Sequence, residues 1–534
     1  MRDRRTIWMA AALLVAIGVG LRTWNLTGDP MWLDEAYSAY AADHGFGFLW
    51  RVVPLYESHP PFYYTLLHLW VLPFGDGLAS LRLFGWTFGI ATLPALWLVA
   101  ASMGRWIGWE ADERRRLQLA VVALASLSLA LVEMTREIRP YSQMILLYTI
   151  EIGLILRLAT RAERGRPIFG RSLIGYLLLL EALVWLHNLG ALYGLALTLA
   201  LAFALPLRQL ARRDWIALVA GHVMVGLLYL PCLMILRGQA AVWTQHTWLQ
   251  FSLNWGLIDH LMILYGVPGW IGLGSLVLAG IATIALHRAA HGRQLTAMLL
   301  TLALLPPITA ILLSLTIAPV FVTRIMTATA IPALLLLGIG ASAPGRYRML
   351  GVGAAVLIGA SMLTADVQAR MGPPMQDWYR TVDWLAAHFN RGDQIFAYPN
   401  EGKLPLHYAL RDKGLSYPIR AIPRDVPALE DRHGTHPTGT RGVSSLPRPE
   451  LHAIAQEPAT KRVPTIWLLR LGAKTYDPGD MFLQELHRDR YIVRSWQDGP
   501  IDIIGLRLRT LARPVPHPRE VDLKSQPAPV RNRR

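Results

Sequence analysis

Acidic side chains stand directly beside an apolar segment near the start of this 534-residue sequence. Asp34 and Glu35 follow that segment and are flanked by Trp32 and Tyr37. A carboxylate next to a bilayer is costly unless it faces water, a cation or a substrate. Such a group could be a general base that takes a proton from a hydroxyl. The alternative is a helix N-terminal cap, where the helix dipole favours negative charge.

A histidine farther along the same polar segment is a second candidate. His59 precedes Pro60 and Pro61, which favour the start of a helix. His59 could bind a phosphate, or a metal together with Glu57, although one His and one Glu are too few for a metal site. The alternative is a proline-capped helix at the membrane interface. His187 ends another outside turn, where a lone histidine is more often a hydrogen-bonded residue than a ligand.

Arginines mark the remaining outside turns. The segment EMTREIRPYS holds Glu137, Arg139 and Tyr141, and Arg324 is the only charge between two later apolar segments. Arg82, at the outer end of the second apolar segment, is a further candidate. A guanidinium group binds phosphate through two parallel hydrogen bonds. The alternatives are an ion pair within the turn for Arg139 and a snorkelling anchor for Arg324.

These side chains together form a chemical inventory. A base and several cations at the outer ends of different segments are what transfer of a group from a lipid phosphate to a hydroxyl requires.

The composition identifies the setting of these residues. Hydrophobic residues make up 53% of the chain, charged residues 16%, and the mean hydropathy is +0.33. Soluble proteins carry about 25% charged residues, so a soluble multidomain chain is excluded, as is low-complexity disorder. One cysteine excludes a disulfide scaffold. The net charge of +16 comes from arginines spread between apolar segments, which favours a role in membrane topology over nucleic-acid binding.

The apolar segments predict a polytopic α-helical membrane protein. A helix that spans a bilayer needs about 20 mostly apolar residues. The first segment follows MRDRR and lacks a small-residue cleavage site, so we expect an uncleaved helix. About eleven spans are expected, at 7–25, 80–102, 117–133, 142–158, 172–188, 190–206, 215–236, 266–287, 295–317, 325–341 and 349–366.

The arginines orient these spans. With a cytoplasmic N-terminus, nineteen arginines fall in cytoplasmic segments and seven in outside segments before residue 366. This bias follows the positive-inside rule. An odd number of spans places the C-terminal part outside. The arginine-rich, lysine-poor usage is typical of a GC-rich bacterial genome. We expect a multi-pass protein of the bacterial inner membrane, with a cytoplasmic N-terminus and a periplasmic C-terminal domain.

Three outside regions are longer than turns. Residues 26–79 contain two amphipathic stretches, 34–50 and 59–72, expected as interfacial helices. Residues 237–265 are rich in tryptophan, as expected at headgroup depth. In the polar C-terminal region we predict a helix at 377–389 and strands at 394–400, 465–471, 491–496 and 502–509, with a loop at 424–462.

This pattern predicts three parts. Residues 1–366 form a transmembrane catalytic module, residues 367–513 a small soluble α/β domain, and residues 514–534 a disordered tail.

The sequence also resembles a known family. The segments LDEAYSAYA, SHPPFYYTLLHLWVLPFG, LRLFGWTFGI, REIRPYSQMILLYTI and PVFVTRIMTATAIP occur in the order seen in membrane glycosyltransferases of the GT-C fold. The resemblance covers roughly residues 5–370 and is to the protein O-mannosyltransferase-like and aminoarabinose-transferase-like enzymes, including the bacterial lipopolysaccharide-core branch. The segment QDWYRTVDWLAAHFNRGDQIFAYPN resembles the soluble C-terminal part of many bacterial members.

The resemblance implies an activity. A sugar would move from a polyprenyl-phosphate donor to a hydroxyl of an envelope glycan, lipid or protein at the periplasmic face, with inversion at the anomeric carbon. By the family pattern, Asp34 matches the catalytic base and Glu35 accompanies it. His59 lies where relatives place a phosphate- or metal-contacting residue, and Arg139 and Arg324 match positions near the donor phosphate. No clear second acidic pair lies in an outside loop, which favours arginines as the charge clamp; no cofactor is required, and a divalent metal is left open.

Two other classes of protein remain as alternatives. A transporter or flippase of lipid-linked sugars would have ionisable residues at mid-membrane, for which Glu151 and Glu181 are candidates. A non-catalytic scaffold that binds a partner through its C-terminal region would leave the acid pair and the outside arginines without a purpose.

Overall fold

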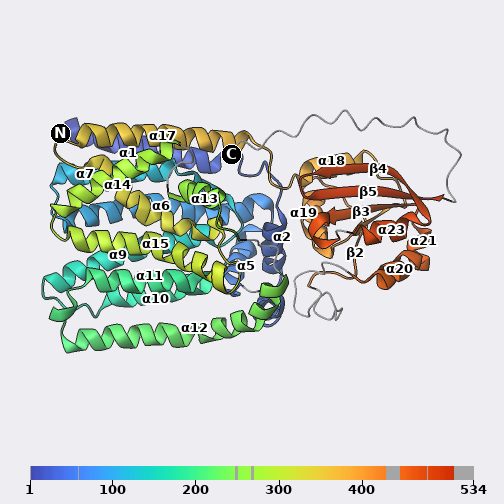
Figure 1. Cartoon of the computed structure of the whole chain (residues 1–534), viewed down its shortest axis with the longest axis horizontal. Helices are drawn as coiled ribbons and strands as arrows, with labels where there is room; N and C mark the ends of the chain where they lie inside the picture. The colour runs from blue at the N-terminus through green and yellow to red at the C-terminus, as the bar shows by residue number, and fades with distance from the viewer. Residues whose placement is uncertain are drawn as a thin grey trace.

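The computed structural model describes residues 2–57, 59–246, 251–265, 270–427, 446–477 and 479–509. It consists of a long helical bundle with a module built on a five-stranded sheet at one end (Figure 1). The expected helical membrane fold with a small C-terminal α/β part is thus confirmed.

Seven stretches of helix in the described residues are long and apolar enough to cross a membrane. An eighth candidate is a pair of helices, α7 (Ala111–Ser126) and α8 (Leu129–Arg136), which are bent by 56° at the break between them. The seven lie in α1 (Arg2–Thr23), α6 (Leu78–Trp106), α9 (Tyr141–Glu163), α12 (Arg212–His246), α15 (Gly292–Thr316), η3 (Thr323–Thr329) with α16 (Ala330–Ser342), and α17 (Arg348–Met371).

The other three predicted spans form shorter helices. These are α10 (Arg171–Leu186), α11 (Gly190–Ala204) and α14 (Leu273–His287), of 16, 15 and 15 residues. They lie beside the long helices (Figure 1). At about 1.5 Å per residue they are shorter than a bilayer core, so they cross it only where the bilayer thins or flanking residues extend the path. Every predicted span thus contains a helix, and length and composition support seven or eight of them.

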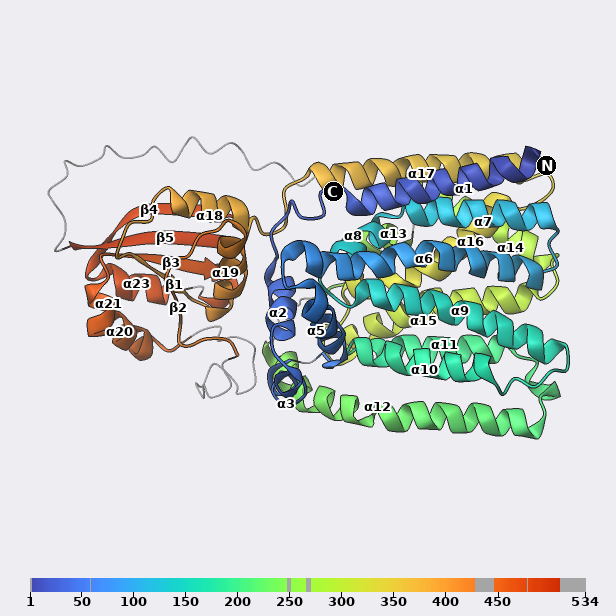
Figure 2. The ribbon, with the colours of Figure 1, turned by 180° about the vertical axis from the view of Figure 1, so that it is seen from behind.

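The two ends of the bundle differ. The N-terminus lies at the end farthest from the sheet (Figure 2). The connections from α6 to α7, α9 to α10 and α16 to α17 lie at that same end, and the arginines expected on the cytoplasmic side lie in these connections or in the adjoining turns of the helices.

Four short helices close the end of the bundle that faces the sheet. They are α2 (Leu33–Ala42), α3 (Phe46–Arg51), α4 (Val53–Tyr56) and α5 (Phe62–Phe74). α2 begins with two acidic residues in its first turn, which the helix dipole favours. α5 begins after Pro61, as the proline pair predicted.

The predicted outside loop at 237–265 is partly helical, which corrects the expectation. α12 continues through His246, and α13 spans Trp255–Tyr265. Arg237 and Gly238 look like a helix end, but one glycine inside a helix costs only about 1 kcal/mol, so the helix continues. Trp248 lies outside the described residues, and the Trp255 side chain is largely exposed.

The C-terminal sheet has the strand order β2-β1-β3-β5-β4. β1 is parallel to β2 and β3, whereas β5 is antiparallel to β3 and β4. The strands are β1 (Gln394–Ala397), β2 (Ile419–Ala421), β3 (Thr465–Leu471), β4 (Arg490–Asp498) and β5 (Ile501–Leu508). Four of them coincide with predicted strands, and the three-residue β2 was too short to predict.

Helices cover both faces of this sheet. α18 (Trp378–Ala386) and α19 (Lys403–Asp412) pack on one face, and α20 (Arg448–Gln456) and α23 (Met481–His487) on the other. α20 and α21 (Pro458–Arg462) lie inside the stretch 424–462 that was predicted as a loop. That prediction was wrong for these residues because their prolines occupy the first turns of helices, where proline is favourable. Residues 428–445 and the tail 514–534 lie outside the described residues.

Close approach of α16 and α17 predicts a stability difference between two glycines of α17. A Cβ on Gly351 would meet the backbone oxygen of Gly340, whereas a Cβ on Gly353 would meet nothing within 4 Å. Small residues allow such close backbone packing. We expect Gly351→Ala to lower stability by about 1–3 kcal/mol, as overpacking does, and Gly353→Ala to leave it unchanged. Thermal unfolding in detergent measures this; equal midpoints would contradict the packing.

Candidate active site

The predicted acid Asp34 meets a predicted arginine. Asp34 Oδ2 accepts a hydrogen bond from Arg324 Nη2 at 2.9 Å, and Nε of the same guanidinium donates to Tyr141 Oη at 3.2 Å. The Arg324 guanidinium also lies over the Trp32 ring, 4.6 Å from its centroid. α2, η3 and the start of α9 therefore converge on one charged pair, although Asp34 and Arg324 are 290 residues apart in the chain.

The neighbouring acid, Glu35, has other partners. Its Oε2 pairs with Arg82 Nη2 at 3.1 Å, and its Oε1 accepts from the backbone N–H of Ile138 at 3.0 Å. Arg82 also donates to the carbonyl oxygens of Leu26 and Asp29, at 2.8 and 2.9 Å. A buried carboxylate with this many partners fixes structure, so Glu35 joins α2 to α6 and to the turn at 137–140.

The two predicted histidines form a hydrogen-bonded chain. The backbone N–H of Leu189 donates to His187 Nδ1 at 3.1 Å, so a neutral His187 carries its proton on Nε2. That nitrogen lies 3.1 Å from Nε2 of His59, whose Nδ1 lies 2.7 Å from Glu57 Oε1. One arrangement satisfies all three contacts: His187 donates to His59, and His59 donates to Glu57.

Arg139 lies beside His59 in this hydrogen-bonded series and has N–H donors that no partner accepts among the described residues. Its Nη2 is 3.4 Å from His59 Nε2, while Nε and Nη1 are buried and have no partner among the described residues. Burial lowers the pKa of Arg139, but surrounding charges, Asp34 first, raise it, and the net direction is upward. Arg139 is therefore a buried, permanent cation, and unpaired buried donors are costly unless a ligand takes them.

A cavity of about 320 Å³ opens beside this cluster. Trp32, Glu35, Arg82, Glu137 and Arg324 line it, together with residues 372–376, which follow α17. Burial raises the pKa of the Glu137 carboxyl to about 7, although the nearby Arg324 lowers it. The cavity thus has both cationic and acidic walls.

All nine predicted site residues lie at the end of the bundle that faces the sheet. The structure adds other residues for which the sequence predicted no role. Trp32, under the Arg324 guanidinium, was noted only as a neighbour of the acid pair. Arg370, which lies in the last turn of α17 and pairs with Glu133, and Gln376, which follows α17, also line the cavity. Nothing in their spacing marked them. Within the described ranges, no group of three or more His, Cys, Asp or Glu residues could hold a metal ion.

Comparison with solved structures gives the class of fold: this chain has the GT-C fold of membrane glycosyltransferases. Apo ArnT from Cupriavidus metallidurans, an aminoarabinose transferase, is 12% identical with a TM-score of 0.57, covering 94% of this chain and 98% of ArnT. ArnT bound to undecaprenyl phosphate gives 13% and 0.54, covering 94% and 99%. At this identity the match shows the fold. No protein-family model and no curated protein matched the sequence.

The different partners of the two acids predict different effects on stability. Glu35→Ala leaves buried Arg82 without its countercharge and orphans the N–H of Ile138, so we expect a loss of about 3–5 kcal/mol. Asp34→Asn keeps a side chain of the same shape beside the partly exposed Arg324 and should cost clearly less. Unfolding temperatures of both variants in one detergent measure this, and a Glu35→Ala midpoint equal to that of Asp34→Asn would contradict the structural role.

Glu137 predicts a dependence of stability on pH. Its carboxyl keeps its proton in the fold up to about pH 7, against 4.5 for the ordinary group. The fold therefore loses stability as the pH rises from about 4.5 to about 7, and the loss is complete above that. Glu137→Gln should gain stability relative to wild type across this window, whereas exposed Asp112→Asn should not. Parallel pH profiles of unfolding temperature for Glu137→Gln and wild type would refute the assignment.

Proposed function

We propose that this protein is an inverting membrane glycosyltransferase that uses a polyprenyl-phosphate-linked sugar. The GT-C fold supports a glycosyltransferase in general. The ArnT complex with undecaprenyl phosphate supports a lipid-phosphate donor, because that protein shares the fold over 94% of this chain. The acceptor is a hydroxyl of an envelope glycan, lipid or protein.

One observation carries the proposal: a carboxylate and two guanidinium groups from distant parts of the chain meet at the sheet end of the bundle. Asp34 contacts Arg324, and its charge acts on Arg139, whose Nε and Nη1 lack partners. A phosphate oxygen would satisfy these donors with charge-assisted hydrogen bonds. Transfer of a sugar from a lipid phosphate needs this combination of base and cations.

In the proposed reaction, Asp34 takes the proton of the acceptor hydroxyl. The acceptor oxygen attacks the anomeric carbon from the side opposite the phosphate, and a new glycosidic bond forms with inversion. The bond between the anomeric carbon and the phosphate oxygen breaks, and the polyprenyl phosphate leaves with the electron pair. Arg139 and Arg324 neutralise the charge that develops on the leaving phosphate.

The Asp34–Arg324 pair links donor binding to base strength. A bound phosphate shares Arg324 with Asp34, and a carboxylate with less positive charge beside it accepts a proton more readily. Asp34 therefore becomes the stronger base when the donor is present.

The site lies on the side of the membrane where the C-terminal module stands. The arginine-rich connections at the opposite end favour a cytoplasmic location for that end. We therefore place the reaction on the periplasmic face of a bacterial inner membrane. No step of this mechanism requires a cofactor.

Asp34→Asn is expected to abolish sugar transfer and leave the fold intact, because it removes the proton acceptor and keeps the shape of the side chain. The measurement is mass analysis of lipid-linked sugars and envelope glycans in cells that carry wild type, the variant or no copy of the chain. Asp112→Asn, at the other end of the bundle, is the control. Cells with Asp34→Asn should accumulate the donor and lack one sugar, like cells without the chain.

Normal glycans in the Asp34→Asn cells would refute Asp34 as the base. Movement of a lipid-linked sugar across vesicle membranes, without transfer of the sugar, would instead favour the flippase alternative.

Arg139→Gln is expected to weaken the binding of undecaprenyl phosphate to the purified protein about tenfold or more, since a charge-assisted hydrogen bond contributes about 1.5–3 kcal/mol. Arg115→Gln, whose partly exposed side chain pairs with Asp112 at the other end of the bundle, is the control and should bind like wild type. Titration of the lipid phosphate at fixed salt gives the affinities. Equal affinities for Arg139→Gln and wild type would exclude Arg139 from the phosphate site.

A further inference from the structure

α2, the helix that carries Asp34, lies between the helical bundle and the C-terminal module (Figures 1 and 2). Its first backbone N–H, from Leu33, donates to Oε1 of Gln376 at 3.1 Å. Gln376 belongs to the segment between α17 and α18, 343 residues away in the chain. A residue of the C-terminal region therefore binds the start of the helix, one residue before the proposed base.

Gln376 is itself held in place. Its Oε1 also accepts from Nε1 of Trp378 at 3.0 Å, and Trp378 is fully buried in the core between α18 and the sheet. The first N–H groups of a helix have no partner within the helix, so a fixed external acceptor decides where that helix begins and how it is turned. The rigid core of the sheet module thus defines the position of the first turn of α2.

Further contacts bind α2 to the same module along its length. Tyr37 Oη donates to Glu401 at 2.9 Å, and Tyr40 Oη donates to the carbonyl oxygen of Val426 at 3.0 Å. At the far end of the helix, Tyr408 Oη donates to Asp43 at 3.0 Å.

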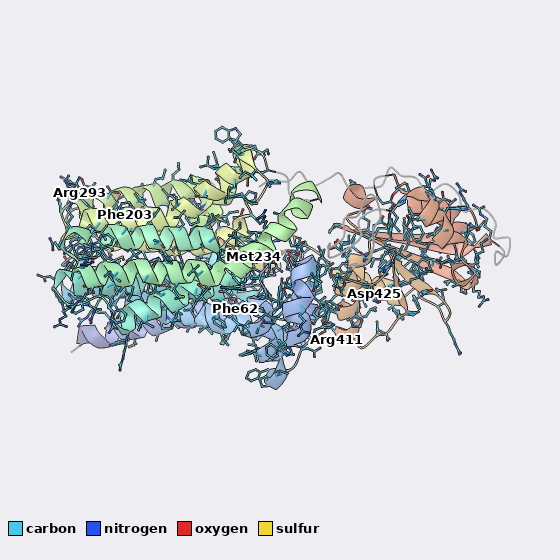
Figure 3. The ribbon with its side chains drawn as sticks, turned by 90° about the horizontal axis from the view of Figure 1, so that it is seen from below. Phe62, Phe203, Met234, Arg293, Arg411 and Asp425 are labelled. Carbon is cyan, nitrogen blue, oxygen red and sulfur yellow. The ribbon has the colours of Figure 1, made fainter. Side chains whose placement is uncertain are left out.

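A charged pair joins the two parts as well. Arg411 of α19 pairs with Asp76, which lies between α5 and α6 of the bundle. Figure 3 shows Arg411 and Asp425 on the side of the module that is nearer to the bundle.

α2 is therefore fixed from two sides. On the bundle side, Glu35 binds the N–H of Ile138 and Arg82. On the other side, Gln376 binds the N–H of Leu33. Asp34 stands between these two attachments, so the direction of its carboxylate toward Arg324 depends on both.

We propose that Gln376 is a positioning residue for Asp34, through which the C-terminal module keeps the base aligned with the reacting groups. The inference rests on the proposed function, because it assumes that Asp34 is the base. A displacement of about 1 Å at a reacting group can cost about 100-fold in rate. Gln376 lines the cavity beside Arg324, but its amide oxygen binds Leu33 and Trp378 and not the two phosphate-binding arginines, so we expect binding of the donor phosphate to change little when Gln376 is replaced.

The test compares three variants of the full-length protein. Gln376→Leu removes the acceptor oxygen. Gln376→Glu keeps an oxygen at the same place for the N–H of Leu33 and for Trp378. Gln456→Ala, whose amide donates to Asp489 elsewhere in the module, is the matched control.

The readouts are kcat and KM with donor lipid extracted from cells that lack the chain, the affinity for undecaprenyl phosphate, and the unfolding temperature. Gln376→Leu should lower kcat about 10- to 100-fold with KM and lipid affinity unchanged. Gln376→Glu should restore most of kcat, and Gln456→Ala should match wild type. If Gln376→Leu does not fold, Trp378→Phe, which removes the indole N–H donor to Gln376 together with part of a buried ring, should give a smaller fall in kcat.

Wild-type kcat in Gln376→Leu, or a raised KM with kcat unchanged, would overturn the inference. A fall in kcat that Gln376→Glu fails to restore would also overturn it, because the acceptor oxygen would then not be the cause. The Asp34→Asn variant separates the two proposals. If it transfers sugar, the proposed function fails; if it is inactive while Gln376→Leu is fully active, only the role of Gln376 fails.

Discussion

The arrangement of Asp34, Arg139 and Arg324 depends on the carboxylate of Glu35, which is buried at the first turn of α2. It pairs with Arg82 of α6 and accepts the N–H of Ile138 in the turn between α8 and α9. A buried charge with such partners is expensive to disturb, because removal of one partner leaves the other unpaired. Glu35 therefore fixes the distance between α2 and the turn that carries Arg139. Its neighbour Asp34, on the same helix turn, is left to face Arg324.

The balance of charge in the cluster explains how it can accept an anion. Asp34 and Glu35 each have an arginine partner, and Glu57 is paired with His59. Arg139 lies only 3.4 Å from a ring nitrogen of His59 and keeps two buried nitrogens without partners among the described residues. An incoming phosphate would satisfy groups that the protein itself leaves unsatisfied. The two acids differ in their partners. Glu35 binds Arg82 and the N–H of Ile138 and so stabilises the fold, whereas Asp34 faces Arg324 and is the proposed base.

The sequence was sufficient to predict the helical membrane fold, because long apolar segments between arginine-rich turns have few other solutions. It also identified Asp34, Arg139 and Arg324 as candidates, because a charged side chain beside a bilayer is costly unless it has a partner or a ligand. Length was a poorer guide where α10, α11 and α14 are too short for the usual span. The prolines at the start of α20 and α21 led to the wrong prediction of a loop.

What the sequence could not supply were contacts between distant segments. The division of labour between Asp34 and Glu35 depends on partners in other helices. The bond from Leu33 to Gln376 joins residues 343 positions apart. Periodicity describes which face of a helix is apolar, and it holds no information about which remote side chain meets a backbone N–H at its end.

The most direct test of the central claim is a structure of the full-length protein in lipid with undecaprenyl phosphate bound. The account predicts that the phosphate lies within hydrogen-bond distance of the Arg139 and Arg324 guanidinium groups, with the Asp34 carboxylate facing the side of the phosphate where the sugar would be attached. A phosphate bound away from both arginines, with Asp34 still paired to Arg324 and remote from the lipid, would contradict it.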